Sequence, residues 1–275
     1  MTHGTRFVAV AVLAALALCV PVQAQTPEIE ALRARAEQGD GDAQFALGLM
    51  YATGDGIVED QAEASRWLGL ATEQADTLEG FRLRAEQGNA DAQYTLGFMY
   101  ATGEVVEQDE VEALHWLEMA AEQRDPRGQN GLGMMYITGL GVPQVAAEAV
   151  RWFRLAAEQG YVGGQNNLGV SYRQGVGVPQ DDTEAVRWFR LAAEQGHADA
   201  QFELAVGFAE GLGVSQDDVQ AYLWSTVAYV TYRTGDEREM VVEHRGVVAE
   251  RMTPQQVAEA QRLAREWDAA HPREP

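Results

Sequence analysis

Lysine is absent from this chain of 275 residues, so its 20 basic residues are all arginine, against 42 aspartates and glutamates. The formal net charge at pH 7 is −22, and the isoelectric point is about 4.5. Nucleic-acid binding needs a basic surface, and none is visible here. The acidic balance predicts a soluble surface that favours neutral or cationic partners and does not bind nucleic acid.

Cysteine occurs once, as Cys19, inside an apolar run near the N-terminus. The rest of the chain therefore has no disulfide, thiolate metal site or cysteine nucleophile. Leu16–Cys19 resembles a lipobox, but Leu18 stands where a small residue is expected, which disfavours lipidation. The absence of thiols also suits an exported protein, because nothing can be misoxidised.

The N-terminus has the features of a signal peptide. The run Phe7–Val20 is too short to span a bilayer stably, and Val22-Gln23-Ala24 fits a signal peptidase site. We expect residues 1–24 to be cleaved and the mature chain to begin at Gln25. The repeat style described below looks bacterial, so we expect a periplasmic or secreted protein with no stable membrane span. An uncleaved anchor is the alternative.

Catalytic and metal-binding patterns are also missing. The histidines are scattered and show no metal-ligand spacing: His3, His115, His197, His244 and His271. Asp60 lies among acidic loop residues, but their spacing does not match a calcium loop, and a helix cap explains Asp60 better. We therefore predict no catalytic residues, no metal site, no cofactor and no enzymatic activity.

What the sequence does contain is a repeat. The sequence of Gly164–Gln195 is nearly identical to that of Gly128–Gln159. Three tryptophans recur at intervals of 36 residues: Trp116, Trp152 and Trp188. Self-similarity at such a period is typical of solenoids built from stacked units.

Each unit predicts two helices. In the first, Leu168 and Tyr172 share one face, and Gly169 leaves room for a partner helix. Asp181 is a candidate N-cap of the second helix, with Glu184 completing a capping box. The apolar stripe of the second helix, one large residue per turn, is Ala185, Trp188, Phe189, Ala192 and Ala193. Neither helix can bury its stripe alone, so the hairpins must stack.

These residues carry the pattern A-x-x-x-L-G-x-x-Y, then G-x-G-V, then A-x-x-W-(Y/F)-x-x-A-A, which resembles the Sel-one-like repeat family, relatives of the tetratricopeptide repeats. The resemblance covers roughly Glu30–Tyr232 and implies an all-α superhelical solenoid. Five repeats would occupy residues 25–232, and capping helices with a tail would occupy residues 233–275. The five tryptophans in equivalent places are expected in the core: Trp67, Trp116, Trp152, Trp188 and Trp224.

Two extra segments interrupt the regular spacing. Trp67 and Trp116 are 49 residues apart, 13 more than the period, and Glu79–Gln87 matches Glu30–Gln38. We predict separate short helices near residues 28–38 and 77–87.

The resemblance also suggests a binding surface, because the first helices of tetratricopeptide arrays line the concave face. The positions are two residues before the Leu of the Leu-Gly pair, then two and five after it. The predicted partner-binding residues are Phe45, Leu49, Tyr94, Phe98, Asn130, Met134, Asn166, Val170, Arg173 and Phe202, with Ala52, Ala101, Ile137, Val206 and Ala209 completing the stripe. Such an apolar, aromatic surface suits a peptide; the alternative is that these side chains fill the superhelix themselves.

The function expected is that of an exported, monomeric, non-catalytic scaffold that binds a protein or peptide. Some cysteine-rich relatives are associated with β-lactam binding or hydrolysis, but this chain lacks their cysteines and shows no nucleophile–base pair. A self-associating component of the cell envelope is the third alternative.

Overall fold

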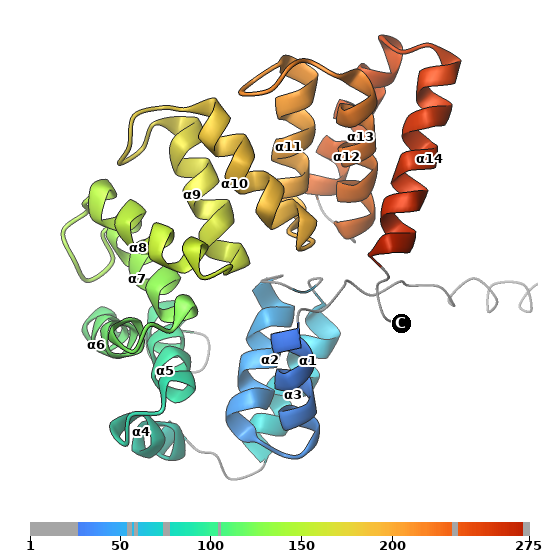
Figure 1. Cartoon of the computed structure of the whole chain (residues 1–275). Helices are drawn as coiled ribbons and strands as arrows, with labels where there is room; N and C mark the ends of the chain where they lie inside the picture. Colours follow the sequence, from blue (N-terminus) through green and yellow to red (C-terminus); the bar gives the residue numbers. More distant parts are fainter. Residues whose placement is uncertain are drawn as a thin grey trace, which may run out of the picture.

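A computed structural model describes residues 27–53, 57, 60–73, 78–103, 106–232 and 236–271. The predicted signal segment, residues 1–24, lies outside this description. Within the described residues every regular element is an α-helix (Figure 1). The helices are α1 Pro27–Glu37, α2 Gly41–Thr53, α3 Gln61–Glu73, α4 Leu78–Glu86, α5 Ala90–Thr102, α6 Glu110–Glu122, α7 Pro126–Thr138, α8 Ala146–Glu158, α9 Val162–Gln174, α10 Asp182–Glu194, α11 Ala198–Glu210, α12 Asp218–Thr231, α13 Asp236–Glu250 and α14 Pro254–Ala270.

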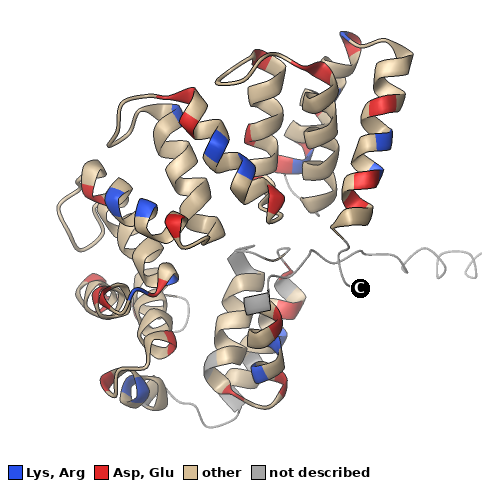
Figure 2. Ribbon diagram, viewed as in Figure 1, with Lys and Arg blue, Asp and Glu red and all other residues tan. Residues whose placement is uncertain are grey.

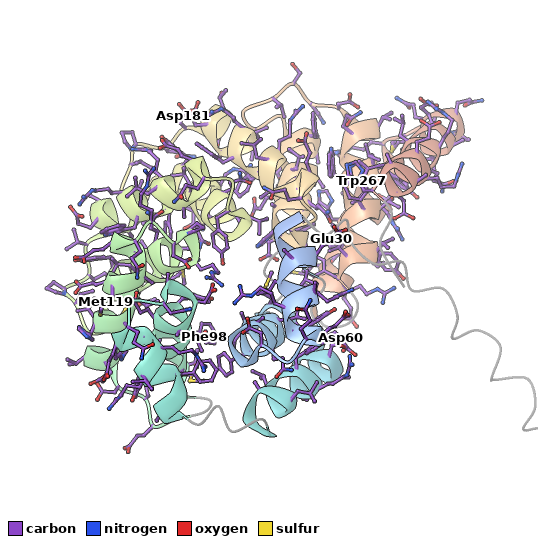
Figure 3. The ribbon with its side chains drawn as sticks, turned by 60° about the horizontal axis from the view of Figure 1, so that its bottom comes forward. Glu30, Asp60, Phe98, Met119, Asp181 and Trp267 are labelled. Carbon is purple, nitrogen blue, oxygen red and sulfur yellow. The ribbon has the colours of Figure 1, made fainter. Side chains whose placement is uncertain are left out.

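The helices form the predicted solenoid. Five hairpins pair a first with a second helix: α2 with α3, α5 with α6, α7 with α8, α9 with α10, and α11 with α12. From α6 onward each second helix also packs on the next first helix. The array curves round, so that α1–α3 lie inside the bend, facing α5 and the α9–α10 hairpin (Figures 1 and 3).

Local signals set the helix ends, but the capping box predicted from Glu184 does not form. The Asp181 N–H donates to the Tyr172 carbonyl at 3.0 Å, and the Glu184 carboxylate accepts from Arg187 at 3.1 Å. Gly175 ends α9 with φ of 69°, the left-handed conformation that glycine tolerates. Asp181 then begins α10, because its carboxylate accepts hydrogen bonds from the backbone N–H groups of Thr183 and Glu184. Asp60 accepts in the same way from Ala62 and Glu63 at 2.9 and 3.1 Å, which confirms its role as a cap.

The packing glycines bring the two helices of a hairpin together. A Cβ atom on Gly169 would lie 2.7 Å from the ring of Phe189, closer than real Cβ contacts allow. Gly97 meets Leu117 of α6 in the same manner at 2.6 Å. The close approach predicted from Gly169 is therefore confirmed, and it recurs along the array.

Buried glutamines join three helices in each unit. The Gln165 side-chain amide donates to the Ala157 carbonyl of the preceding second helix at 3.4 Å, and its Oε1 accepts from Gln195 at the end of α10 at 2.7 Å. Gln93 and Gln201 make equivalent bonds to Ala85 and Ala193. Because a buried amide must be hydrogen-bonded, these residues fix the register between neighbouring units.

Four of the five equivalent tryptophans are core residues, with exposed fractions of 4% for Trp67 and Trp116, 7% for Trp188 and 8% for Trp224. Trp152 is only half-buried, whereas the neighbouring Phe153, the equivalent of Phe189, is 2% exposed. The prediction that all five lie in the core was therefore wrong for Trp152.

The two extra helices, α1 and α4, coincide with the segments expected near residues 28–38 and 77–87 and occupy the places of second helices. Arg82 of α4 donates to the Tyr100 hydroxyl at 2.8 Å, just as Arg154 of α8 donates to Tyr172 at 2.9 Å. Arg33 of α1 donates to Tyr51 at 2.5 Å. Thus α1 and α4 stack on α2 and α5 as α8 stacks on α9, although each lacks a first helix of its own.

The C-terminal pair caps the array by packing on α12. The Trp267 ring of α14 meets Trp224 edge to face at 5.9 Å, and Val248 of α13 packs with Ala209 and Ala221. Thr253 begins α14 with a reciprocal capping box to Gln256 and with Pro254 in the first turn.

Burial predicts the cost of truncating these rings. Trp188→Ala is expected to lower the free energy of unfolding by about 3–5 kcal/mol, because a large buried side chain leaves a cavity. Trp267→Ala should cost less, because Trp267 is only half-buried. Urea titrations followed by circular dichroism test the comparison. A loss under about 1 kcal/mol at Trp188 would contradict the packing described here.

Candidate binding surface

The predicted stripe is partly exposed on α5. Tyr94 and Phe98 are half-buried, with ring centroids 6.3 Å apart, and Phe98 lies on the side of α5 that faces the N-terminal helices (Figure 3). The Arg127 guanidinium from α7 lies 5.0 Å from the centroid of the Tyr94 ring, a distance suited to a cation–π contact.

On α2 the predicted stripe is closed. Phe45 and Leu49 are 1% and 3% exposed, and the Phe45 ring meets Phe81 of α4 edge to face at 5.4 Å. The face of α2 that the resemblance assigned to a partner instead packs on α5, with Phe81 of α4 at its edge. Phe45 and Leu49 are therefore core residues, which corrects the prediction for these two.

The two asparagines also differ from expectation. Asn130 is half-buried, and its Oδ1 accepts a hydrogen bond from Asn167 at 2.9 Å. Asn166 is only 8% exposed, so it does not present an amide to a partner beside Asn130. The pair that meets across neighbouring repeats is Asn130 with Asn167. Met134, next along α7, is 42% exposed.

Further along the stripe the polar groups are used internally. Arg173 forms ion pairs with Glu203 at 3.0 Å and Asp182 at 3.3 Å. Phe202 meets the His244 ring edge to face at 5.4 Å. Val170, Ala101, Ile137 and Val206 are half-buried, Ala209 is buried, and the side chain of Ala52 lies outside the description.

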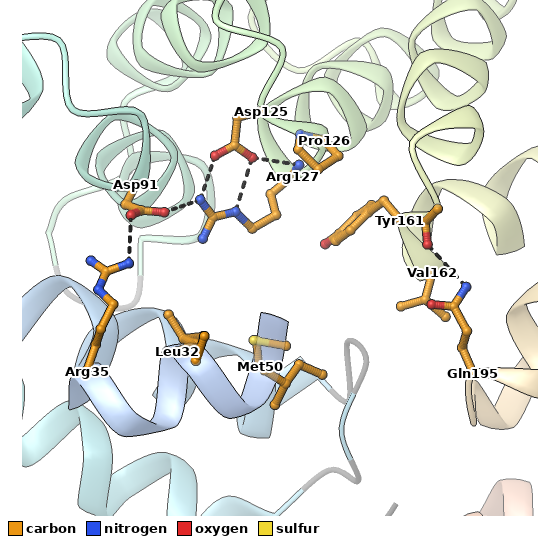
Figure 4. Close-up of a pocket in the computed structure, with 13 residues that line it drawn as sticks. Leu32, Arg35, Met50, Asp91, Asp125, Pro126, Arg127, Tyr161, Val162 and Gln195 are labelled. Atoms are coloured by element: carbon orange, nitrogen blue, oxygen red, sulfur yellow. Dashed lines mark hydrogen bonds and ion pairs between the residues drawn. The ribbon is translucent and has the colours of Figure 1, made fainter. Parts of the chain in front are cut away.

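A cavity of about 420 Å³ lies beside the N-terminal ends of α5, α7 and α9, three of the helices that carry this stripe (Figure 4). One wall comes from α1 and α2, and the other comes from the first turns of α5, α7 and α9 with the residue that follows α10. Its lining is Ile29, Ala31, Leu32, Arg35, Met50, Asp91, Asp125, Pro126, Arg127, Gly160, Tyr161, Val162 and Gln195. The lining combines aliphatic side chains, one aromatic ring and a group of paired charges.

The charges form a chain of ion pairs across the cavity. The Arg127 guanidinium bonds Asp125 at 2.5 Å and also bonds Asp91 of α5, and Arg35 of α1 reaches the same Asp91 at 3.3 Å. Burial raises the pKa of Asp91, but Arg127 and Arg35 outweigh it, so the pKa lies below its ordinary value. Burial lowers the pKa of Arg127, but hydrogen bonds and attraction from Asp125 and Asp91 raise it overall. Both arginines are therefore held in place by carboxylates.

No sequence signal pointed to this cavity. Asp91 and Arg127 hold equivalent places in consecutive repeats, and Tyr161 is the N-cap residue of α9. Turn residues of this kind were interpreted only as helix caps. The change from Asp91 to Arg127 at the same place in consecutive repeats was the available clue.

Among the described residues no group of three or more histidine, cysteine, aspartate or glutamate side chains could hold a metal ion. His244 lies 3.0 Å from the Ser225 hydroxyl, but that serine is fully buried and also bonds the Ala221 carbonyl. The described part of the chain also contains no helix with the length and hydrophobicity needed to cross a bilayer.

Comparison with known proteins identifies the repeats. The family model described as Sel1 repeat matches residues 41–76, 90–125, 126–161, 162–197 and 198–229, which is more than half of the chain. No curated protein matches the sequence.

Two crystal structures are similar over most of the chain. A protective antigen of uropathogenic Escherichia coli strains with an SLR fold is 32% identical, with a TM-score of 0.64 over 90% of this chain. The chain spans 57% of the length of that protein. A Sel1 repeat protein from Oxalobacter formigenes is 28% identical, with a TM-score of 0.54 over 78% of this chain and 79% of its own.

The ion-pair chain predicts a pH dependence of stability. Because the folded state lowers the pKa of Asp91, this carboxylate stabilises the fold above its ordinary pKa, and the contribution is lost as pH falls through the folded value. Asp91→Asn should cost about 1–3 kcal/mol at pH 7, and the cost should shrink as the pH is lowered below the ordinary aspartate pKa. Urea titrations at pH 7 and at a pH below that pKa measure this, with the exposed Glu118→Gln as the matched control. An equal loss at both pH values would contradict the ion-pair account.

Proposed function

This chain belongs to the Sel1 repeat proteins, and from that membership we propose that it is a non-catalytic scaffold that binds a segment of a partner protein in the cavity on its inner face. Sel1 repeat proteins generally mediate protein–protein interactions. The cavity is the single observation that carries the finer part of the proposal, because it is the place where apolar and polar side chains from five helices converge on open space.

The composition of the cavity supports a peptide ligand. Leu32, Met50 and Val162 offer contacts for an aliphatic side chain, and the Tyr161 ring points into the space (Figure 4). Binding sites commonly combine an apolar lining with a few placed polar groups. Gln195 places such a group at the edge of the cavity. Its side-chain amide donates to the Gly160 carbonyl at 3.1 Å, which fixes its position.

The arginines favour a rigid site over a flexible one. Arg35 and Arg127 are both paired with carboxylates of this chain, so neither needs an anionic ligand to balance its charge. A partner would keep this network and add contacts at its edge. The half-buried Tyr94, which lies under Arg127, and the exposed Met134 extend the proposed surface along α5 and α7.

Site-specific photocrosslinking tests the proposal. A benzoyl-phenylalanine placed at Tyr161 should capture a partner protein from a native envelope fraction, whereas the same group at Leu155, an exposed residue of α8, should not. With the captured partner purified, Tyr161→Ala should weaken binding at least tenfold and Leu155→Ala should leave it unchanged. Equal capture at both positions, or unchanged binding by folded Tyr161→Ala, would place the site elsewhere.

Export is part of the same proposal. We propose that the protein is periplasmic or secreted, on the basis of the signal-like residues 1–24. The E. coli relative is described as a protective antigen, which agrees with an exported protein. Protein isolated from its native host should begin at Gln25 by N-terminal sequencing. Recovery of chains that begin at Met1 or Thr2 from the envelope would contradict export by cleavage.

A further inference from the structure

The helix α1 presents a face that every other helix of its kind keeps covered. Buried glutamines fix the equivalence, because Gln44 donates to the Ala36 carbonyl as Gln93 donates to Ala85 and Gln165 to Ala157, at 3.0, 2.9 and 3.4 Å. The residue four places before each of these alanines is therefore the same structural position. It is held by Leu32, Phe81, Leu117, Phe153 and Phe189 in α1, α4, α6, α8 and α10.

In the complete hairpins this position meets a first helix at its glycine. Cβ atoms on Gly97, Gly133 and Gly169 would lie within 2.7 Å of Leu117, Phe153 and Phe189. These side chains are between 0% and 3% exposed. The position is therefore built to receive the backbone of a neighbouring α-helix.

The extra helix α4 has no first helix of its own and borrows one. Phe81 packs edge to face on Phe45 of α2 and is 2% exposed. The backbone of α2 meets α3 at Gly48, whereas its contact with α4 is made by the Phe45 side chain. This solution supports the idea that the position requires a helical neighbour.

For α1 no described helix supplies that neighbour. Leu32 is half-buried and lines the cavity together with Ala31 from the same helix. The open volume of about 420 Å³ has room for a few aliphatic side chains. The unoccupied space lies where the other units place a first helix.

We infer that the partner segment bound in this cavity is an amphipathic α-helix of the first-helix type, which sets a small residue against Leu32. The inference rests on the proposed function, because it names the kind of segment that the same cavity takes. The glycine contacts of Leu117, Phe153 and Phe189 supply the model for this packing. The rim carboxylates Asp91 and Asp125 are already paired with arginines, which leaves the contact mainly apolar.

The helix α5 provides a probe, since its Gly97 already faces a leucine, Leu117. A fluorescent peptide with the sequence Asn89–Gly103, held helical by a hydrocarbon staple because short helices are marginal in water, is titrated with the full chain. Fluorescence anisotropy should rise to saturation. Replacing Gly97→Leu in the peptide should weaken binding at least tenfold, because the leucine would collide with Leu32. A linear peptide carrying Met99→Pro, which cannot form the helix, should not bind.

Variants of the protein locate the site. Leu32→Glu should weaken binding at least tenfold, and the matched change Leu83→Glu, on the exposed side of the equivalent helix α4, should change it less than twofold. Ala31→Trp, at an exposed residue that lines the cavity, should also abolish binding by filling the space, which keeps the test valid if Leu32→Glu unfolds. Circular dichroism checks each fold.

Three results would overturn the inference: no saturable binding of the stapled peptide, equal binding by the folded cavity variants, or equal binding of the proline peptide. Capture of a partner at Tyr161 combined with any of these would leave the proposed function standing and remove only its helical ligand. Light scattering tests for a second copy of this chain in the cavity. A mass that rises with concentration, and does so no longer in Leu32→Glu, would assign the cavity to self-association and overturn the inference of a helix from another protein.

Discussion

The close approach of paired helices at a glycine is the contact on which the rest of the structure depends. Gly97, Gly133 and Gly169 let the second helix of each hairpin bring a leucine or phenylalanine against the first helix backbone. Once this contact is set, buried glutamines such as Gln165 tie the hairpin to the helix before it. These two contacts repeat along the stack. A second helix that has no first helix to pack on therefore leaves that face open.

The 13 extra residues between Trp67 and Trp116 change the array because they add a second-type helix without a first. That helix, α4, packs mainly on α5, and its Phe81 also meets Phe45 of α2, which itself packs on α5. The N-terminal helices are thereby held inside the bend of the solenoid (Figure 1). Figure 2 shows acidic and basic residues spread along the helices of the array. The charges that line the cavity are paired across α1, α5 and α7.

Sequence periodicity was enough to predict the helices, the hairpins and the caps, because each depends on residues close together in the chain. Asp181 caps α10 as predicted, although Glu184 does not complete a capping box. The binding stripe was harder to predict. Phe45 could face either a partner or Phe81, and the choice depends on how α4 packs. The 36-residue repeat pattern does not specify the packing of an inserted helix. The cavity was missed because α1 and the first turns of α7 and α9 meet only after the array has curved.

The central claim is that α1 and the turns opposite it form the surface that a partner covers. Hydrogen–deuterium exchange of the complex with its captured partner tests this most directly. The account predicts slower exchange in residues 27–37 and in the first turns of α7 and α9, with no change in α13 and α14. Protection confined to α13 and α14 or to the glycine loops, with residues 27–37 exchanging as in the free protein, would contradict it.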